Sequence, residues 1–577
     1  MFLFIFHPLR KDIKVLLAAY PSMNLRSVLE PGTTLWAIQR MQWKAIGIKD
    51  EDFNKPKIAV VNSSSNLSVC YIHLDEVSKK VQEAIRSAGG LPFEIRTTAP
   101  SDAITSVGKN ARYILPSRDL IVNDIEVMVE GALLDGMVCL SSCDKTTPAH
   151  LMAAARLNIP TIIVPCGYQL GGYLDGESVD WQDVYEGVGA YKKNLMSLAH
   201  LQRMADVAVC GPGVCPGLGT ANTMHMVSEA LGMSLPGSSP VRAGGEKLFQ
   251  MASRSGEQIV SLVERNILPR DIITERSIEN SVRLVQAIGG SVNVVRHLAA
   301  IATEAELDFD VVACFEKCAD GASQLTSIRP NGKYRIEDLE RAGGVLGVMK
   351  QLSPQLHLDA MTVAGISIGE VLSKVGGVDE EIIRPLHNPF KKEAGLTIVR
   401  GNLAPDGAIV KNAGIPSHMK FLKGPARVFE SEEDAFNHIN DFKPGDVAVL
   451  RGLGPKGGPG TVFAASFVAS LNGAGLAEKV AVITDGELSG ELRGLTIGQV
   501  MPEAAEGGPL AVVADGDMVS VDLEKKRVDI LISDEELKTR MAAWRPKRQK
   551  MKRSWLSIYS EVVQPISKGA VLGSISD

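Results

Sequence analysis

Three cysteines set in segments rich in serine, glycine or proline are the residues of this sequence whose chemistry stands out. Cys143 is followed directly by Asp144 and Lys145 in SSCDKTTP. Cys215 lies in GPGVCPGLGTANTM, and Cys70 lies in NSSSNLSVCYIHL. A thiolate is a soft ligand suited to iron–sulfur clusters, copper or zinc, whereas a carboxylate suits a hard cation such as Mg²⁺. Cys143 and Asp144 could therefore face two metals of different character, and a buried cysteine followed by an ordinary polar turn is the alternative.

The other cysteines fit packing better than metal binding. The chain has eight cysteines, and disulfides are not expected in a large chain without an export pattern. No pair of CxxC motifs has the spacing of a zinc knuckle, so distant thiols would have to be gathered by the fold. We expect Cys139 and Cys166 to pack in strands, Cys210 to lie near the glycine-rich pocket, and Cys314 and Cys318 to share one helical face without binding a metal.

The elements that must position these thiols alternate between short β-rich runs and amphipathic helices from about residue 57. KIAVVNSSS and DGMVCLSSCDKT each read as a buried strand that runs into a loop. The run SRDLIVNDIEVMVEGALL predicts a helix with Ser117 as its N-cap. This βαβα order indicates a parallel sheet with helices on both faces. Ligands bind beyond the carboxyl ends of such strands, which is where Cys70 and Cys143 fall.

Composition places the chain among globular α/β proteins with more than one domain. It has 577 residues, 45% hydrophobic and 22% charged, with a net charge of −6. No basic block is present, so nucleic acid and anionic membranes are poor partners. No run approaches the ~18 apolar residues that a membrane span needs, and we expect a cytoplasmic protein.

The predicted secondary structure changes along the chain. Residues 1–22 read as an N-terminal extension without a catalytic role, with Met23 as an alternative start. Residues 245–375 are helix-rich, and short β runs separated by glycine and proline follow, which indicates a β-barrel or a sandwich. We therefore place an α/β domain at 23–390 and a smaller C-terminal domain at 391–577.

Several segments, taken together, resemble one family. CDKTTPAHLMAAARLNIP, CPGLGTANTM, NGKYRIEDLERAGGV, GPKGGPG, DGELSG and PEAAEGGPLAVVADGD run in the same order as in the dihydroxy-acid and sugar-acid dehydratases, from about residue 23 to the C-terminus. The sequence is identified as a divergent member of that family. The resemblance implies a large α/β N-terminal domain, a smaller C-terminal β-barrel that carries the catalytic serine, and a site between them.

The resemblance also implies two metal centres. A 2Fe-2S cluster, with a 4Fe-4S cluster as the alternative, would be held by Cys70, Cys143 and Cys215. One iron left open would bind the departing hydroxyl as a Lewis acid. A Mg²⁺ ion would bind the substrate carboxylate, with Asp102, Asp144 and Lys145 as its ligands. Because an ammonium has no lone pair, Lys145 could coordinate only if neutral or carbamylated.

Ser489 matches the family's catalytic base, and Lys145 belongs to the same catalytic group. A nearby cation lowers the pKa of a hydroxyl enough for the serine to take the proton from carbon 2. Elimination of water would give an enol, which tautomerises to a 2-keto acid.

The chain departs from the family at the predicted pocket. Phe463 stands where relatives carry a glutamate that completes the magnesium site, and Glu487 stands where they carry an arginine. Glu487 and Glu491 flank Ser489 by two residues on either side, so in an extended turn all three side chains point the same way. One of these glutamates could replace the missing ligand, and two solvated surface glutamates are the alternative.

These residues favour an active hydro-lyase that acts on a small hydroxy acid. GTANTM, LNIP and GKYRIEDLERAGG lean toward the branched dihydroxy acids of amino-acid biosynthesis. A sugar-acid (aldonate) dehydratase is one alternative, and a non-catalytic paralogue that serves as a binding or regulatory subunit is another. The resemblance further implies a homodimer or homotetramer.

Overall fold

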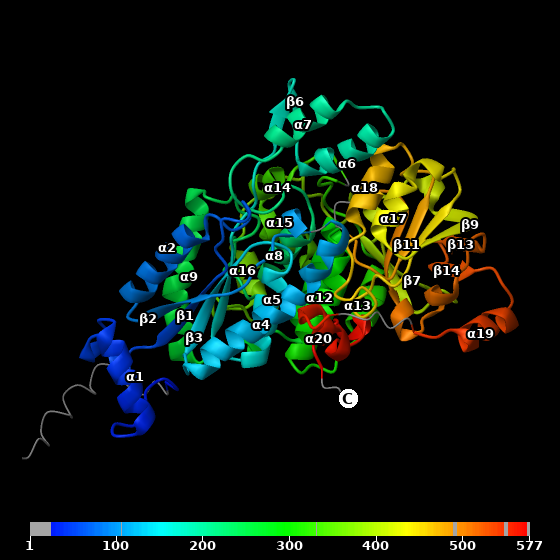
Figure 1. The fold of residues 1–577 in the computed structure, drawn as a ribbon. Coiled ribbons are helices and arrows are strands. Elements are labelled where there is room, and N and C mark those ends of the chain that lie inside the picture. The colour runs from blue at the N-terminus through cyan, green and yellow to red at the C-terminus, as the bar shows by residue number, and fades with distance from the viewer. Residues whose placement is uncertain (1–24, 106, 331, 489–492, 547–551, 574–577) are drawn as a thin grey trace, which may run out of the picture.

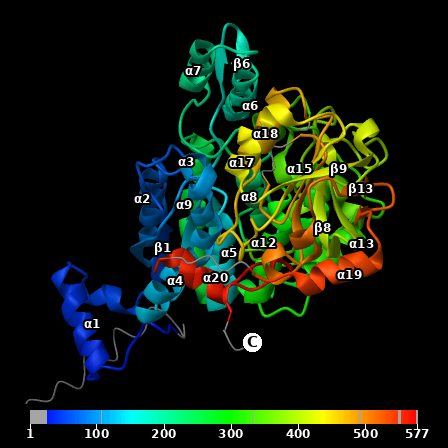
Figure 2. The ribbon, with the colours of Figure 1, turned by 45° about the vertical axis from the view of Figure 1, so that its right-hand side comes forward.

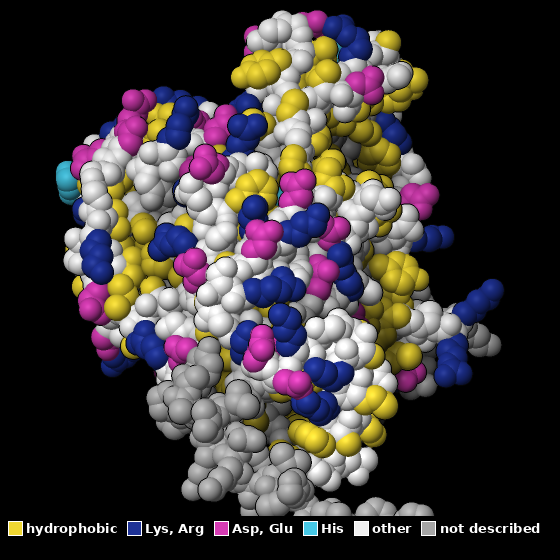
Figure 3. All heavy atoms as spheres, turned by 90° about the vertical axis from the view of Figure 1, so that its left-hand side faces the viewer, with side chains coloured by type: hydrophobic (Ala, Val, Ile, Leu, Met, Phe, Trp, Pro, Cys, Tyr) yellow, Lys and Arg dark blue, Asp and Glu magenta, His cyan; other side chains and the backbone are white. Residues whose placement is uncertain are grey.

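The protein is described here from a computed structural model, which describes residues 25–105, 107–330, 332–488, 493–546 and 552–573 (Figure 1). Ser489, Glu491 and the N-terminal extension 1–22 lie outside these ranges. None of the helices in the described part of the chain has both the length and the apolar character that crossing a membrane requires. On the face shown in Figure 3, acidic and basic side chains are interspersed.

The N-terminal part of the protein, called the sheet half below, is built on a four-stranded parallel sheet. Its strand order is β2-β1-β3-β4. The strands are β1 Lys57–Asn62, β2 Leu91–Arg96, β3 Gly136–Ser141 and β4 Thr161–Pro165. Every residue of β1, β3 and β4 is buried, as expected for strands covered on both faces. The predicted α/β fold with a parallel sheet is confirmed.

Helices connect these strands and cover the sheet (Figure 1). The first ones are α1 Thr34–Ala45, α2 Leu74–Ser87, α3 Asp102–Thr105, α4 Ile114–Gly131 and α5 Thr146–Leu157. The prediction that Ser117 caps α4 is wrong: the helix begins at Ile114, and the Ser117 hydroxyl donates to the Ile114 carbonyl at 2.6 Å. A short 3₁₀ turn at Gly108–Tyr113 runs straight into α4, so the chain needs no polar cap there.

The middle of the chain is helical, as predicted. Its helices are α8 Thr220–Ala230, α9 Glu246–Arg265, α10 Pro269–Ile272, α11 Glu275–Ile288, α12 Asn293–Glu304, α13 Val311–Ala319, α14 Ile336–Ala342, α15 Gly344–Leu352 and α16 Ile368–Ser373. Glycine lets α9 lie close against α2, because a Cβ on Gly256 would lie 2.5 Å from the Val81 carbonyl oxygen. A separate protrusion contains β5 Gly172–Leu174, β6 Glu177–Val179, α6 Trp181–Lys192 and α7 Leu198–Val207 (Figure 2).

The C-terminal part of the protein, called the barrel half below, folds into a closed eight-stranded barrel. Of the two predicted alternatives, a β-barrel and a sandwich, the barrel is therefore correct. The order around the barrel is β10-β11-β12-β8-β7-β14-β13-β9. The strands are β7 Leu396–Gly401, β8 Ala404–Lys411, β9 Phe421–Phe429, β10 Val447–Leu450, β11 Ala481–Thr484, β12 Thr496–Met501, β13 Met518–Asp522 and β14 Arg527–Ile530. The helices α17 Glu432–Asn437, α18 Ala465–Gly473, α19 Asp534–Ala543 and α20 Trp555–Val562 accompany it.

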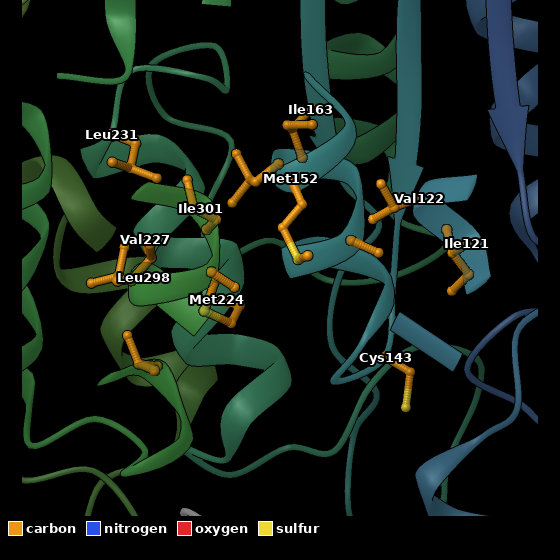
Figure 4. Close-up of a cluster of buried hydrophobic side chains, with 14 of the residues drawn as sticks. Ile121, Val122, Cys143, Met152, Ile163, Met224, Val227, Leu231, Leu298 and Ile301 are labelled. Carbon is orange, nitrogen blue, oxygen red and sulfur yellow. The ribbon is translucent and has the colours of Figure 1, made fainter. Parts of the chain in front are cut away.

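The two halves share one hydrophobic core. A single cluster of buried side chains includes Val61 of β1, Ile301 of α12 and Val482 of β11. Figure 4 shows Cys143 at the margin of this cluster, with its side chain pointing away from Met152.

Candidate active site

Cys70 and Cys143 follow two neighbouring parallel strands, β1 and β3, and meet at their carboxyl ends. Both side chains are 4% exposed. The contact with the Cys70 thiol, together with burial, raises the pKa of the Cys143 thiol well above its usual range. A bound soft metal would supply the positive charge that favours the ionised forms of two buried thiols in contact. The pair therefore fits a thiolate-binding metal group.

Hydrogen bonds fix the backbone on both sides of this pair. The Ser142 hydroxyl donates to the Cys70 carbonyl at 2.5 Å. The Ser142 carbonyl lies 3.1 Å from Nε2 of His225 on α8, and the Ser142 amide donates to the Thr146 hydroxyl at 3.0 Å. Side chains from α8 and α5 thus hold the turn that carries Cys143.

The segment of the third predicted thiol runs beside the Cys70 loop. The Gly213 amide donates to the Val69 carbonyl at 3.0 Å. Gly213 has φ +114°, and a Cβ there would lie 2.7 Å from the Tyr168 backbone, so only glycine permits this approach. Cys215 itself is half-buried, and its carbonyl accepts from the Asn222 side chain at 2.7 Å. Within the described part of the chain, no three His, Cys, Asp or Glu side chains already form a metal-binding group.

Two buried carboxylates lie next to the thiols. Asp102, at the start of α3, and Asp144 are 5% and 7% exposed. Burial, followed by the nearby Asp144 carboxylate, raises the pKa of Asp102 well above its usual range. Neither oxygen of Asp102 has a hydrogen-bond partner among the described residues. Two adjacent buried carboxylates fit a hard cation such as Mg²⁺.

Lys145 joins this group to the barrel half of the molecule. Its Nζ lies 2.9 Å from Oε1 of Glu487, which follows β11, and 3.7 Å from Oδ2 of Asp102. The same Glu487 oxygen lies 2.9 Å from Nη2 of Arg296 on α12. Although burial opposes the shift, Arg296 and Lys145 lower the pKa of Glu487. Because Glu487 is fully buried, the alternative of a solvated surface glutamate is wrong for this residue.

Phe463 lies beside the same lysine. Its ring centre is 5.7 Å from Lys145 Nζ, and its side chain is buried. The backbone of this segment pairs with that of Glu487, because the Glu487 amide donates to the Val462 carbonyl and the Ala464 amide donates to the Glu487 carbonyl, each at 3.0 Å. The departure from the family pattern thus gives this side of the site an apolar wall.

Two further buried carboxylates hold the glycine-rich loop, residues 452–460, that leads to Phe463. Asp485 accepts from the Gly452, Leu453 and Ala504 amides at 2.9–3.0 Å. Glu503 accepts from the Lys456 and Gly457 amides at 2.8 and 3.2 Å. Burial, reinforced by Asp485, raises the pKa of Glu503 to about 8.

Sequence reasoning missed Arg296, Asp485 and Glu503. Asp485 and Glu503 lie in DGELSG and PEAAEGG; Asp485 precedes a glycine directly, and Glu503 lies in a glycine-containing segment. Arg296 lies on α12, next to His297, where an arginine gives no local sign of a buried partner.

The remaining cysteines have no place in this group. Cys139 and Cys166 are fully buried in the core. Cys210 is exposed. The Cys314 and Cys318 sulfurs lie 3.9 Å apart on α13, as their spacing predicts.

The fold and the site together define a class: a parallel-sheet domain joined to a closed barrel, with paired thiols and paired carboxylates buried where the two meet. Sequence models of the dihydroxy-acid/6-phosphogluconate dehydratase N-terminal and C-terminal domains match residues 55–371 and 381–570.

Curated relatives match over nearly the whole chain. Dihydroxy-acid dehydratase 1 of Methanosarcina acetivorans is 42% identical over 93% of this chain and 98% of its own length. The dihydroxy-acid dehydratase of Caldicellulosiruptor saccharolyticus is 43% identical with the same coverage, and that of Aquifex aeolicus is 39% identical over 93% and 97%. The chain belongs to the dihydroxy-acid/6-phosphogluconate dehydratase family, and it is accordingly a hydro-lyase, as the sequence predicts.

Proposed function

We propose that this protein removes water from a branched 2,3-dihydroxy carboxylic acid and releases a 2-keto acid for amino-acid biosynthesis. The observation that carries the proposal is the buried junction of Cys70 and Cys143 with Asp102, Asp144 and Lys145. The names of the relatives at 39–43% identity favour this substrate class over the aldonic acids.

The thiols fit an iron–sulfur cluster, which we propose to be a 2Fe-2S cluster held by Cys70, Cys143 and Cys215. When bound, this group supplies a Lewis acid for the hydroxyl that leaves. The chain's own part is to keep water away from the reacting atoms, because Cys143, Lys145 and Phe463 are all at most 5% exposed.

Asp102 and Asp144 fit a Mg²⁺ ion, which would supply charge for the substrate's carboxylate and hydroxyl. Lys145 fits less well as a third ligand, because its Nζ is already ion-paired with Glu487. We instead assign to Lys145 the binding of an anionic substrate oxygen, which is a role that an ammonium can fill.

Ser489 remains the proposed base that takes the proton from carbon 2. The preceding residue, Leu488, is 1% exposed, and its carbonyl accepts from the Asn293 side chain at 2.7 Å. The chain is therefore held in the buried junction as far as the residue before the serine.

The test is a keto-acid assay on protein purified and reconstituted with iron and sulfide without oxygen. The panel contains a branched 2,3-dihydroxy acid, an aldonic acid and a phosphorylated aldonic acid, each with Mg²⁺. We expect turnover of the branched acid. Turnover of an aldonic acid alone would contradict the substrate class, and cluster-loaded protein that acts on none of the acids would support the non-catalytic paralogue.

We also propose that the protein acts in the cytoplasm as a homodimer or homotetramer. The resemblance to the family supports both assignments. Light scattering on the reconstituted protein measures the mass of the assembly, and a monomer would contradict the proposed state.

A further inference from the structure

Three buried charged side chains form a line that ends at the proposed site. Lys145 lies at the start of α5, Glu487 follows β11, and Arg296 lies on α12. Both cations contact one oxygen, Glu487 Oε1, each at 2.9 Å. The line therefore crosses from the sheet half of the molecule to the barrel half and back.

Within the described part of the chain, Arg296 depends on this single contact. Its Nε and both Nη atoms have no hydrogen-bond partner among the described residues, and the second oxygen of Glu487 has none either. A buried charge is tolerated when an opposite charge lies beside it, and removal of either partner leaves the other uncompensated. Arg296 thus requires Glu487, whereas Glu487 would keep its contact with the lysine if Arg296 were removed.

Lysine needs such a contact to act from a fixed place. Its four-carbon stem is flexible and its three donors rotate, and a displacement of a reacting or binding group by about 1 Å can cost on the order of a hundredfold in rate. Around Lys145 Nζ, the Asp102 carboxylate at 3.7 Å and the Phe463 ring at 5.7 Å leave Glu487 as its shortest ion pair.

We propose that Glu487 and Arg296 are positioning residues: Glu487 holds the Lys145 ammonium in the site, and Arg296 holds Glu487. The inference rests on the proposed function, because it concerns the lysine assigned there to the substrate. It also gives Glu487 a role other than that of a magnesium ligand, since its Oε1 already contacts two cations.

The test uses Glu487→Gln, Arg296→Met and the double variant, with Glu229→Gln as a matched control. Glu229 is a buried carboxylate that accepts from the Gly237 and Ser239 amides, both at 2.7 Å, away from the lysine. We expect each single variant to lose thermal stability and to lower kcat by on the order of a hundredfold, with little change in KM. Arg296→Lys should recover part of kcat, and Glu229→Gln should leave kcat unchanged.

The double variant separates positioning from folding. The double variant removes the arginine that Glu487→Gln leaves uncompensated, so we expect it to be thermally more stable than Glu487→Gln. Lys145 still lacks Glu487, so kcat should stay as low as in Glu487→Gln. Recovery of kcat along with stability would overturn the inference, because the pair would then serve the fold alone.

Mg²⁺ titration of the purified protein by calorimetry decides whether Glu487 is a ligand. We expect Asp144→Asn to weaken Mg²⁺ binding by at least about tenfold and Glu487→Gln to weaken it far less. Equal losses in the two variants would make Glu487 a ligand and overturn the inference. A native protein that dehydrates none of the acids would overturn the proposed function alone, because the Mg²⁺ affinities and the stability of the double variant are read without turnover.

Discussion

The two halves of the molecule hold their functional loops with opposite chemistry. Around the sheet, buried histidines face backbone carbonyls: His225 Nε2 lies 3.1 Å from the Ser142 oxygen, and His73 Nε2 lies 2.7 Å from the Cys166 oxygen. Around the barrel, the buried carboxylates of Asp485 and Glu503 accept from backbone amides. Burial favours the neutral form of both groups, so it lowers histidine pKa values and raises carboxyl pKa values. The difference teaches that acid and alkali should weaken the two halves separately.

The largest effect should come from the sheet half, where we place the metal-binding thiols. We expect Cys143→Ala to lose nearly all bound iron and to lower kcat by more than about a hundredfold, because the Cys70 thiol would lose its partner. Iron content and visible absorption after anaerobic reconstitution measure this change. Cys139→Ala, in the strand that precedes Cys143, is the control and should keep its iron. Equal losses in both variants would remove the thiol pair from the site.

Glu503→Gln tests the barrel half at high pH. Because the pKa of Glu503 is raised from 4.5 to about 8, the native state holds this proton longer than the unfolded state does. The stabilisation is present below pH 4.5 and is lost as the pH rises through 8, up to about 5 kcal/mol across that window. The glutamine side chain does not titrate, so the variant should unfold at higher urea concentration than the native protein at pH 9 but not at pH 5. An unchanged difference between the two pH values would contradict the raised pKa.

His225→Asn tests the sheet half at low pH. Burial lowers the pKa of His225 from 6.5 to about 4, so the unfolded state takes up a proton first as the pH falls. The native protein should lose up to about 3 kcal/mol between pH 6.5 and 4 through this residue. Asparagine does not titrate and should remove that part of the acid sensitivity, measured by urea unfolding at pH 7 and 4.5. His438, which is half exposed in the barrel half, is the control position.

The sequence predicted some features of the two halves better than others. The loops of Cys70 and Cys143 were predictable because each follows a locally recognisable strand, and the order of the strands brings the loops together. The start of α4 was placed too late, since a 3₁₀ turn at Gly108–Tyr113 supplies what a polar cap would.

Contacts between residues far apart in the chain could not be predicted from local sequence patterns. Arg296 lies on α12, 191 residues before Glu487 in the chain, and only the fold brings the two together. Asp485 and Glu503 bind backbone amides of a loop that no periodicity connects with them. For the same reason the sequence left Glu487 either as a replacement metal ligand or as a surface residue, although it is fully buried.

The last prediction concerns a close backbone approach between the two halves. Gly460 of the glycine-rich loop has φ +91°, and a Cβ there would lie 2.0 Å from the Arg112 carbonyl oxygen, just before α4. Gly516, with φ +85°, has nothing within 4 Å of the same position. Both Gly→Ala changes should cost about 1 kcal/mol for the left-handed backbone, and Gly460→Ala should cost about 1–3 kcal/mol more for the clash. Because the clash would push the loop away from α4, Gly460→Ala should also lower kcat, whereas Gly516→Ala should not. Equal unfolding midpoints and equal kcat values for the two variants would show that the loop does not need this contact to hold Phe463 beside the lysine.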